Sequence, residues 1–209
     1  MNIIKEGDII KRHIIGVDPA LAGDKSALIL LRIVDHVTLR HFQNPLHELR
    51  YDLIGTKTLS GSLVHQAGEI EGIIPRFERC TVALDCTGLG IGLENILYAS
   101  GVYAKKIVIT GGQRANHSGR NLNVPRTVLI ECLQRIIQQQ KLKILKSQYS
   151  DLLLRELESF RSVYTSDGKL RFEADISRSL SHADFSFATA CAVYVAENTG
   201  ECVAVGWPG

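Results

Sequence analysis

Cysteines are few in this sequence, and their spacing excludes two kinds of stabilising site. The 209 residues include five cysteines, an odd number, and no two of them form a Cys-x-x-Cys pair. This pattern argues against a disulfide framework and against a thiolate zinc site. We therefore expect small core side chains at these positions, which are Cys80, Cys86, Cys132, Cys191 and Cys202.

Long hydrophobic runs are also missing. The longest apolar runs, such as residues 27–31 and 188–196, fall well short of the roughly 20 residues that span a bilayer. Charged residues interrupt the apolar positions of the first 18 residues, so they lack the continuous core of a secretory signal. We expect no membrane partner and a cytoplasmic location, which is the host cytoplasm if the source is viral.

One stretch of the chain lacks acidic residues. None occurs between Glu94 and Glu131, although the net charge of the chain is only +2. A local basic segment of this kind is a candidate contact for the phosphates of duplex DNA, and the alternative is a solvated loop without a ligand. Aromatic residues are nearly missing from the segment, which argues against a stacking platform for single strands. Its cations are Lys105, Lys106, Arg114, Arg120 and Arg126.

The first third of the chain has the pattern of antiparallel strands. Apolar runs at residues 13–17 and 26–34 are followed by an alternating segment at residues 37–42. The Asp35-His36 pair suits a tight turn between the last two segments. We therefore predict a three-stranded antiparallel meander.

The pattern then changes to alternating helices and strands. Helical spacing over residues 60–77 precedes an apolar strand at residues 81–84. A glycine-rich turn after Asp85 leads into a helix that ends near Gly101, and residues 106–109 form the next predicted strand. Because helices connect these strands, we expect them to pair in parallel.

The last part of the chain contains a predicted loop and three predicted helices. Residues 111–123 are polar and have no period, which predicts an exposed loop. Helices follow from Pro125 and over residues 150–160, then a hairpin around residues 166–168, and a final helix over about 182–197 that is rich in small residues. The whole pattern predicts an α/β fold, in which a mixed sheet of an antiparallel meander and parallel strands is flanked by helices.

Three aspartates occupy comparable positions in this pattern. Asp18 ends the first strand, Asp85 ends a strand that the parallel crossovers place centrally, and Asp184 begins the final helix. Open α/β sheets bind ligands at strand ends, and converging carboxylates repel one another unless a cation is present. The set therefore indicates a divalent-metal site. Taken singly, each aspartate also suits a turn or a helix cap.

Three segments that contain these aspartates resemble, in the same order, the nuclease motifs of viral terminase large subunits. They are GVDPALAGDKSA at residues 16–27, VALDCTGLGIG at residues 82–92 and SHADFSFATACA at residues 181–192. The resemblance extends over residues 12–197. It implies a ribonuclease H-like endonuclease domain that cleaves concatemeric viral DNA during genome packaging.

The resemblance also implies a set of site residues. Asp18, Asp85 and Asp184 would bind metal, with Asp24 as a supplementary ligand, and the cofactors would be two Mg²⁺ or Mn²⁺ ions. Many members of the family have His-Asp-Asp in the third motif, whereas this chain has His182, Ala183 and Asp184, so one carboxylate is missing. His182 is a candidate proton shuttle because an unperturbed histidine titrates near neutrality, although packing at the helix start is the simpler interpretation.

A terminase large subunit also contains an ATPase motor, whose phosphate loop reads G-x-x-x-x-G-K-[ST]. This sequence has no such run, and its glycine cluster at residues 88–92 lacks the lysine. The resemblance therefore implies one nuclease domain over residues 1–209, with a core of about 12–197 and a tail at 198–209, and no ATPase domain. Its partners would be double-stranded DNA, the motor, a small subunit and a portal.

Three other interpretations remain open. A Holliday-junction resolvase or another ribonuclease H-like nuclease is the first, although the glycine-rich turn after Asp85 favours a terminase. A sugar-kinase or actin-like ATPase is the second, but such proteins need two lobes and 209 residues provide only one. The third is a catalytically weak module for DNA binding and assembly.

Overall fold

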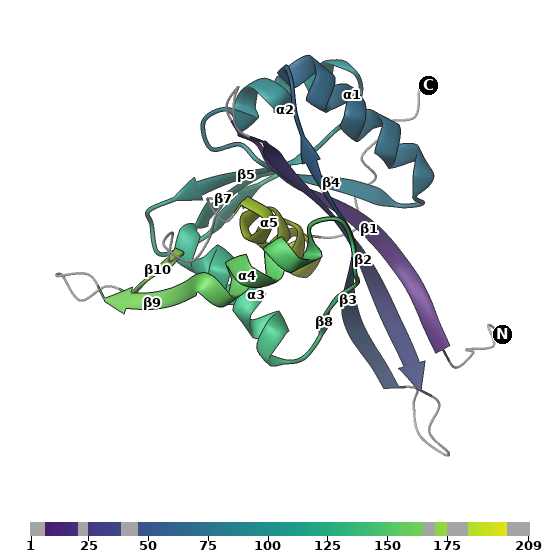
Figure 1. Cartoon of the computed structure of the whole chain (residues 1–209), viewed down its shortest axis with the longest axis vertical. Coiled ribbons are helices and arrows are strands. Elements are labelled where there is room, and N and C mark those ends of the chain that lie inside the picture. The colour runs from purple at the N-terminus through teal and green to yellow at the C-terminus, as the bar shows by residue number, and fades with distance from the viewer. Residues whose placement is uncertain (1–6, 21–24, 39–45, 165–169, 175–183, 200–209) are drawn as a thin grey trace.

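The computed structural model describes residues 7–20, 25–38, 46–164, 170–174 and 184–199. Its centre is an eight-stranded mixed sheet with the strand order β6-β7-β5-β4-β1-β2-β3-β8 (Figure 1). The strands are β1 (Gly7–Asp18), β2 (Ser26–Thr38), β3 (Leu46–Leu59), β4 (Cys80–Asp85), β5 (Lys105–Thr110), β6 (Asn116–Ser118), β7 (Asn121–Pro125) and β8 (Leu142–Ile144).

The pairing of these strands decides which residues meet at one edge of the sheet. Strands β1, β2 and β3 form the predicted antiparallel meander. Strand β4 pairs in parallel with β1, β5 with β4, and β7 with β5. The carboxyl ends of β1, β4, β5 and β7 therefore lie at the same edge of the sheet.

The predicted turn at Asp35-His36 is wrong, because β2 continues through both residues to Thr38. Asp35 lies opposite Ile9 on β1 and Leu49 on β3. Its carboxylate is 3.2 Å from Lys11 Nζ and 2.9 Å from His47 Nδ1, so cross-strand partners hold it within the sheet. The third strand is β3, not the segment predicted at residues 37–42. Residues 37 and 38 of that segment are the end of β2, and residues 39–42 lie outside the described residues.

The loop predicted at residues 111–123 is also partly wrong. Its second half forms the antiparallel pair β6 and β7, and β7 adds to the sheet beside β5. Leu122 and Val124 on β7 are fully buried, whereas Asn121 and Asn123 between them are exposed. This alternation is that of a strand, but it covers too few residues to be distinguished from a loop by period.

Helices cover both faces of the sheet (Figure 1). One face packs against α1 (Leu63–Ile73), the 3₁₀ turn η1 (Ile74–Arg76) and α2 (Gly90–Ala99). The other packs against α3 (Arg126–Gln138), α4 (Ser150–Ser159) and α5 (Asp184–Asn198). Strands β9 (Phe160–Tyr164) and β10 (Leu170–Ala174) pair antiparallel as a separate two-stranded sheet, as predicted, and the turn predicted at residues 166–168 lies outside the described residues.

Helix α5 lies very close to the sheet, as its small residues predict. It packs across β1, β2 and β4. A Cβ atom added to Gly16 of β1 would lie 2.2 Å from the carbonyl oxygen of Ala188 and 3.0 Å from the Cβ atom of Ala192. Only glycine at position 16 therefore allows α5 to take this place.

Two further expectations concern cysteines and membranes. Cys80, Cys86, Cys132 and Cys191 are buried free thiols, as predicted, and Cys202 lies outside the described residues. In the described ranges, the helices are all too short or too polar to cross a bilayer.

Candidate active site

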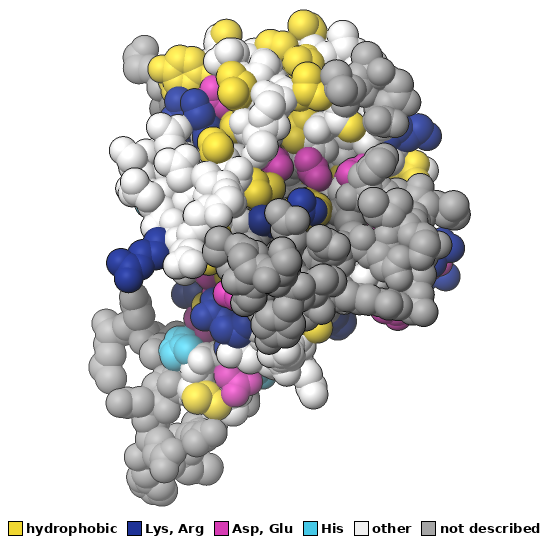
Figure 2. Space-filling view, turned by 90° about the vertical axis from the view of Figure 1, so that its left-hand side faces the viewer, with side chains coloured by type: hydrophobic (Ala, Val, Ile, Leu, Met, Phe, Trp, Pro, Cys, Tyr) yellow, Lys and Arg dark blue, Asp and Glu magenta, His cyan; other side chains and the backbone are white. Residues whose placement is uncertain are grey.

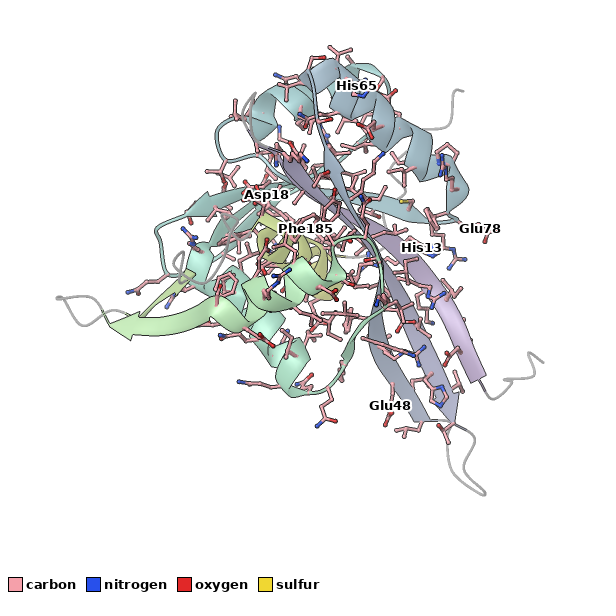
Figure 3. All side chains as sticks on the ribbon, in the orientation of Figure 1. His13, Asp18, Glu48, His65, Glu78 and Phe185 are labelled. Atoms are coloured by element: carbon pink, nitrogen blue, oxygen red, sulfur yellow. The ribbon has the colours of Figure 1, made fainter. Side chains whose placement is uncertain are left out.

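The three predicted aspartates lie around one edge of the sheet. Asp18 is the last residue of β1 and Asp85 the last of β4, and these strands pair in parallel with Val17 opposite Leu84. Asp184 is the first residue of α5, which packs on both strands. Figure 3 labels Asp18 at the end of β1 and Phe185, the residue after Asp184, in the first turn of α5.

The electrostatics of Asp18 show that negative charge converges on it. Burial raises the pKa of Asp18 well above its usual 3.8, and the charges of Asp85, Asp184 and Glu156 raise it further. Burial also raises the pKa of Asp85. A hydrogen bond of 2.7 Å, which Asp85 Oδ1 accepts from the backbone N–H of Thr87, partly offsets this rise because it lowers the pKa. A cation at this edge would relieve the repulsion that raises the pKa of Asp18.

Glu156 is a fourth carboxylate of this region, and it was not predicted from the sequence. It lies on α4, is fully buried, and accepts a hydrogen bond of 2.8 Å from the backbone N–H of Ser186 in the first turn of α5. A negative charge is favourable there, because the first N–H groups of a helix have no partner within the helix. The available signal was its position three residues after the buried Leu153, on the apolar face of a predicted helix.

The glycine-rich turn after Asp85 lets α2 start directly beside the site. A Cβ atom on Gly90 would lie 1.7 Å from the carbonyl oxygen of Asp85, so this position requires glycine. The backbone N–H of Cys86 donates to Ile107 O at 2.7 Å, and Thr87 Oγ1 accepts from the N–H of Ile109 at 2.9 Å. The turn that follows Asp85 is therefore held on β5.

The donor atoms of the site suit a hard divalent cation, because carboxylate oxygens are the ligands that Mg²⁺ and Mn²⁺ prefer. Within the described ranges, however, no three His, Cys, Asp or Glu side chains are close enough together to form a complete metal site. The carboxylates thus converge without forming a ready coordination sphere. Asp24 and His182, predicted as a supplementary ligand and as a shuttle or packing residue, lie outside the described residues.

The five predicted DNA-binding cations differ in their surroundings. Glu94, which is almost fully buried, is 3.4 Å from Lys106 Nζ and 3.0 Å from Arg120 Nη1. The Arg120 guanidinium also lies 4.8 Å from the ring centre of Tyr98. Lys105 is partly buried and Arg114 is exposed. DNA contact by the five residues stays a prediction.

The fifth cation, Arg126, lies beside the carboxylates. It is the first residue of α3, and its guanidinium carbon is 4.5 Å from the ring centre of Phe187 on α5. Its charge acts on both Asp18 and Asp85, and it opposes the rise in their pKa values. Figure 2 shows acidic side chains grouped at the centre of one face, with Lys or Arg side chains next to them.

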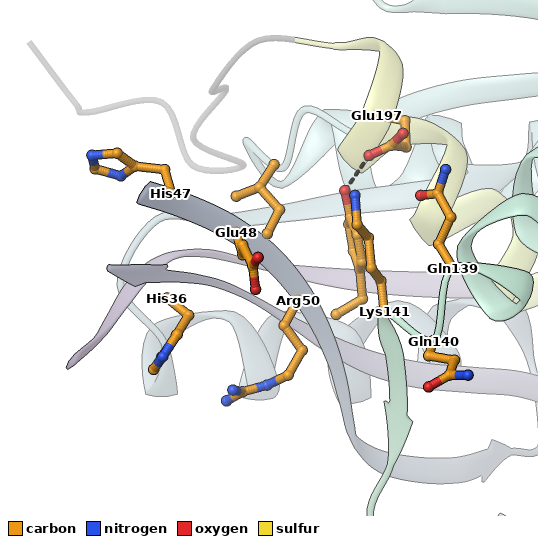
Figure 4. A pocket seen from close by; sticks show the side chains of 10 residues that line it. His36, His47, Glu48, Arg50, Gln139, Gln140, Lys141 and Glu197 are labelled. Carbon is orange, nitrogen blue, oxygen red and sulfur yellow. Dashed lines mark hydrogen bonds between the residues drawn. The ribbon is translucent and has the colours of Figure 1, made fainter. Parts of the chain in front are cut away.

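A separate cavity of about 740 Å³ contains none of the predicted site residues (Figure 4). Its lining includes Arg50 of β3 and Tyr51, whose hydroxyl donates to Glu197. Arg50 already binds the carboxylates of Asp8 and Asp52. Glu197 also pairs with Arg135, so Arg50 and Glu197 are already bound to other side chains, and we assign the cavity no ligand.

Comparison with known proteins agrees with the predicted fold. No protein-family model matches the sequence, and no curated protein matches it significantly. Among solved structures, the large terminase nuclease from thermophilic phage G20c with bound magnesium matches with a TM-score of 0.58 and 15% identity over 91% of this chain and 88% of that chain. The chain has the fold of a phage large terminase nuclease.

Two further structures with this terminase-nuclease fold come from other phages. The large terminase nuclease domain of Thermus phage P74-26 has a TM-score of 0.51 and 14% identity over 88% of this chain and 79% of that chain. The large terminase of bacteriophage HK97 has a TM-score of 0.51 and 12% identity over 90% of this chain but only 40% of that chain. The predicted ribonuclease H-like mixed sheet is confirmed by these matches and by the strand order.

Proposed function

We propose that this chain is a metal-dependent DNA endonuclease of the terminase large-subunit kind, which cleaves concatemeric viral DNA during genome packaging. The observation that carries the proposal is the convergence of Asp18, Asp85 and Asp184 at one sheet edge, where the charges of Asp85 and Asp184 raise the pKa of Asp18. The fold supports it, because the G20c nuclease of the same fold was solved with magnesium and with cobalt.

Each carboxylate has a proposed role as a metal ligand. The charges of Asp85 and Asp184 both raise the pKa of Asp18, so we assign these three residues as the side chains that would hold two Mg²⁺ or Mn²⁺ ions, with Asp18 contributing to both and the other two to one each. When bound, such ions supply charge neutralisation, a water of lowered pKa and stabilisation of the leaving oxygen in phosphodiester hydrolysis. Asp24 and His182 stay proposals for a supplementary ligand and for a packing or proton-shuttle residue.

The proposed substrate is double-stranded DNA, bound through its phosphates by Lys105, Lys106, Arg114, Arg120 and Arg126. Contacts to phosphates carry no sequence information, so cleavage should be weakly sequence-specific and sensitive to salt. By analogy with terminase large subunits, an ATPase motor, a small subunit and a portal are the proposed protein partners, in the host cytoplasm.

The first test is conversion of supercoiled plasmid to nicked and linear forms with Mg²⁺, Mn²⁺ or EDTA. The variants are Asp18→Asn, Asp85→Asn and Asp184→Asn, which remove charge with little change of shape. Asp151→Asn is the matched control, because Asp151 is exposed in the first turn of α4. We expect cleavage to require metal, to be lost in the three site variants and to persist in the control.

Two other outcomes would redirect the proposal. Cleavage of four-way junctions but not of linear or supercoiled duplex would indicate a junction resolvase. If nothing is cut, thermal unfolding with Mn²⁺ decides the next step, because a ligand that binds only the folded state at 100 times its Kd stabilises it by about 2.7 kcal/mol. A protein that binds DNA but gains no stability from metal would be an assembly module.

A further inference from the structure

Arg126 stands at the same sheet edge as the carboxylates. Strand β7 ends at Pro125, and its parallel pairing with β5, and of β5 with β4, brings Arg126 to the edge where Asp18 and Asp85 end their strands. The stack of its guanidinium on Phe187 then ties it to α5, one turn after Asp184. The end of β7, the parallel pairing of its neighbours and the contact with α5 thus all place Arg126 beside the carboxylates.

Arg126 differs from the neighbouring cations in its ion pairing. Lys106 and Arg120 both bind Glu94, whereas within the described ranges no carboxylate lies within 4.0 Å of the Arg126 guanidinium. Arg126 is exposed to solvent, and its charge still acts on both Asp18 and Asp85. As far as the described residues go, its hydrogen-bond donors are therefore available to an incoming anion.

The chemistry of arginine decides which anion fits. A guanidinium is planar, always charged at neutral pH and able to donate two parallel hydrogen bonds to a phosphate. The ring of Phe187 covers one face of the Arg126 guanidinium and limits rotation of the guanidinium. The N–H donors of Arg126, which lie along the edge of this plane, therefore keep their direction. An anion bound there lies next to the carboxylates and to any cation that they hold.

We infer that Arg126 is a catalytic residue that binds the scissile phosphate of DNA and neutralises the charge that develops on it during hydrolysis. This inference rests on the proposed nuclease function. It assigns to Arg126 a role in the chemical step that the other four predicted DNA-binding cations do not have. Those residues would contribute to DNA affinity alone.

If Arg126 has this role, its replacement should lower kcat without weakening metal binding. Removing a stabiliser of transition-state charge lowers kcat by about 100-fold or more, so Arg126→Gln should reduce kcat to this extent with a smaller change in KM for duplex DNA. Without DNA, the same variant should bind Mn²⁺ several-fold more tightly, because a positive charge near Asp18 and Asp85 has been removed. Arg126→Lys should recover part of kcat, since lysine keeps the charge but not the planar pair of donors.

The experiment measures kcat and KM on a fluorescent duplex and Mn²⁺ affinity by calorimetry for the wild-type protein, Arg126→Gln, Arg126→Lys and Arg76→Gln. Arg76 is the matched control, an exposed arginine of η1 whose partner in the described part of the chain is the carbonyl oxygen of Gly72. An unchanged kcat in Arg126→Gln, or joint loss of cleavage and Mn²⁺ binding, overturns the inference and leaves the nuclease proposal in place. A wild-type protein that cuts no DNA with any metal overturns both.

Discussion

Replacing Gly16 with alanine should displace α5 from the sheet and destabilise the protein. The new Cβ atom would lie 2.2 Å from the carbonyl oxygen of Ala188, where ordinary contacts begin at 3.4 Å. The obstacle is helix backbone, which cannot rotate away as a side chain can. Helix α5 would therefore have to move by roughly 1 Å, along with the many contacts it makes with β1, β2 and β4.

The size of the effect follows from this geometry. Overpacking of a core costs 1–3 kcal/mol, and a clash with backbone belongs at the upper end, so we expect a loss of about 3 kcal/mol in the free energy of unfolding. For a chain of this size the loss corresponds to a fall in Tm of about 6–12 °C. Because α5 begins with Asp184 and β1 ends with Asp18, the variant should also lose much of its stabilisation by Mn²⁺.

The assay is urea unfolding followed by circular dichroism, with and without Mn²⁺. Gly55→Ala on β3 is the control, because its Cβ atom would lie 3.7 Å from the Cβ atom of Leu30, an ordinary contact. If Gly16→Ala unfolds within about 0.5 kcal/mol of the wild-type protein, α5 does not lie this close to β1 and the reasoning fails.

Three further predictions concern other parts of the molecule. Gly68→Ala should raise the free energy of unfolding by about 0.5–1 kcal/mol, because Gly68 lies within α1 and its added Cβ atom would contact nothing within 4 Å; thermal unfolding tests this, and a fall in Tm contradicts it. Glu156→Gln should weaken Mn²⁺ binding several-fold, because it removes a charge that acts on Asp18; calorimetry tests it against the exposed Glu131→Gln, and equal affinities refute it. Burial opposes ionisation of Asp52, but hydrogen bonds from Arg50 and Arg32 hold its pKa below 3.8. The charged form is therefore favoured by folding, and its stabilisation is present above pH 3.8 and lost as the pH falls through the lowered value. Asp52→Asn should flatten the loss of stability as the pH falls below about 4, and an unchanged acid profile in urea unfolding would contradict this.

Much of the fold could be predicted because its signals are local. The apolar runs that end at Asp18 and Asp85 mark strand ends, and helix α2 between β4 and β5 requires a crossover that places the ends of these strands together. The small residues of α5 predicted its close contact with the sheet, which Gly16 confirms. The predicted convergence of the three aspartates followed from these elements.

Other features depend on register, which local patterns do not contain. Asp35 suits a turn when considered alone, but Lys11 and His47 on neighbouring strands hold it within β2. Period alone does not separate the short strand β7 from a loop, and its pairing with β5 decides its structure.

The sequence by itself determined the class of fold and the three aspartates of the candidate site, because hydrophobic period and strand ends are properties of short segments. Only the tertiary structure decided which charged residues accompany them. It brings Glu156 beside α5, directs Lys106 and Arg120 to Glu94, and leaves Arg126 near Asp18. The physical reason is that electrostatic interactions depend on distance in space, and residues far apart in the chain become neighbours only when the sheet has formed.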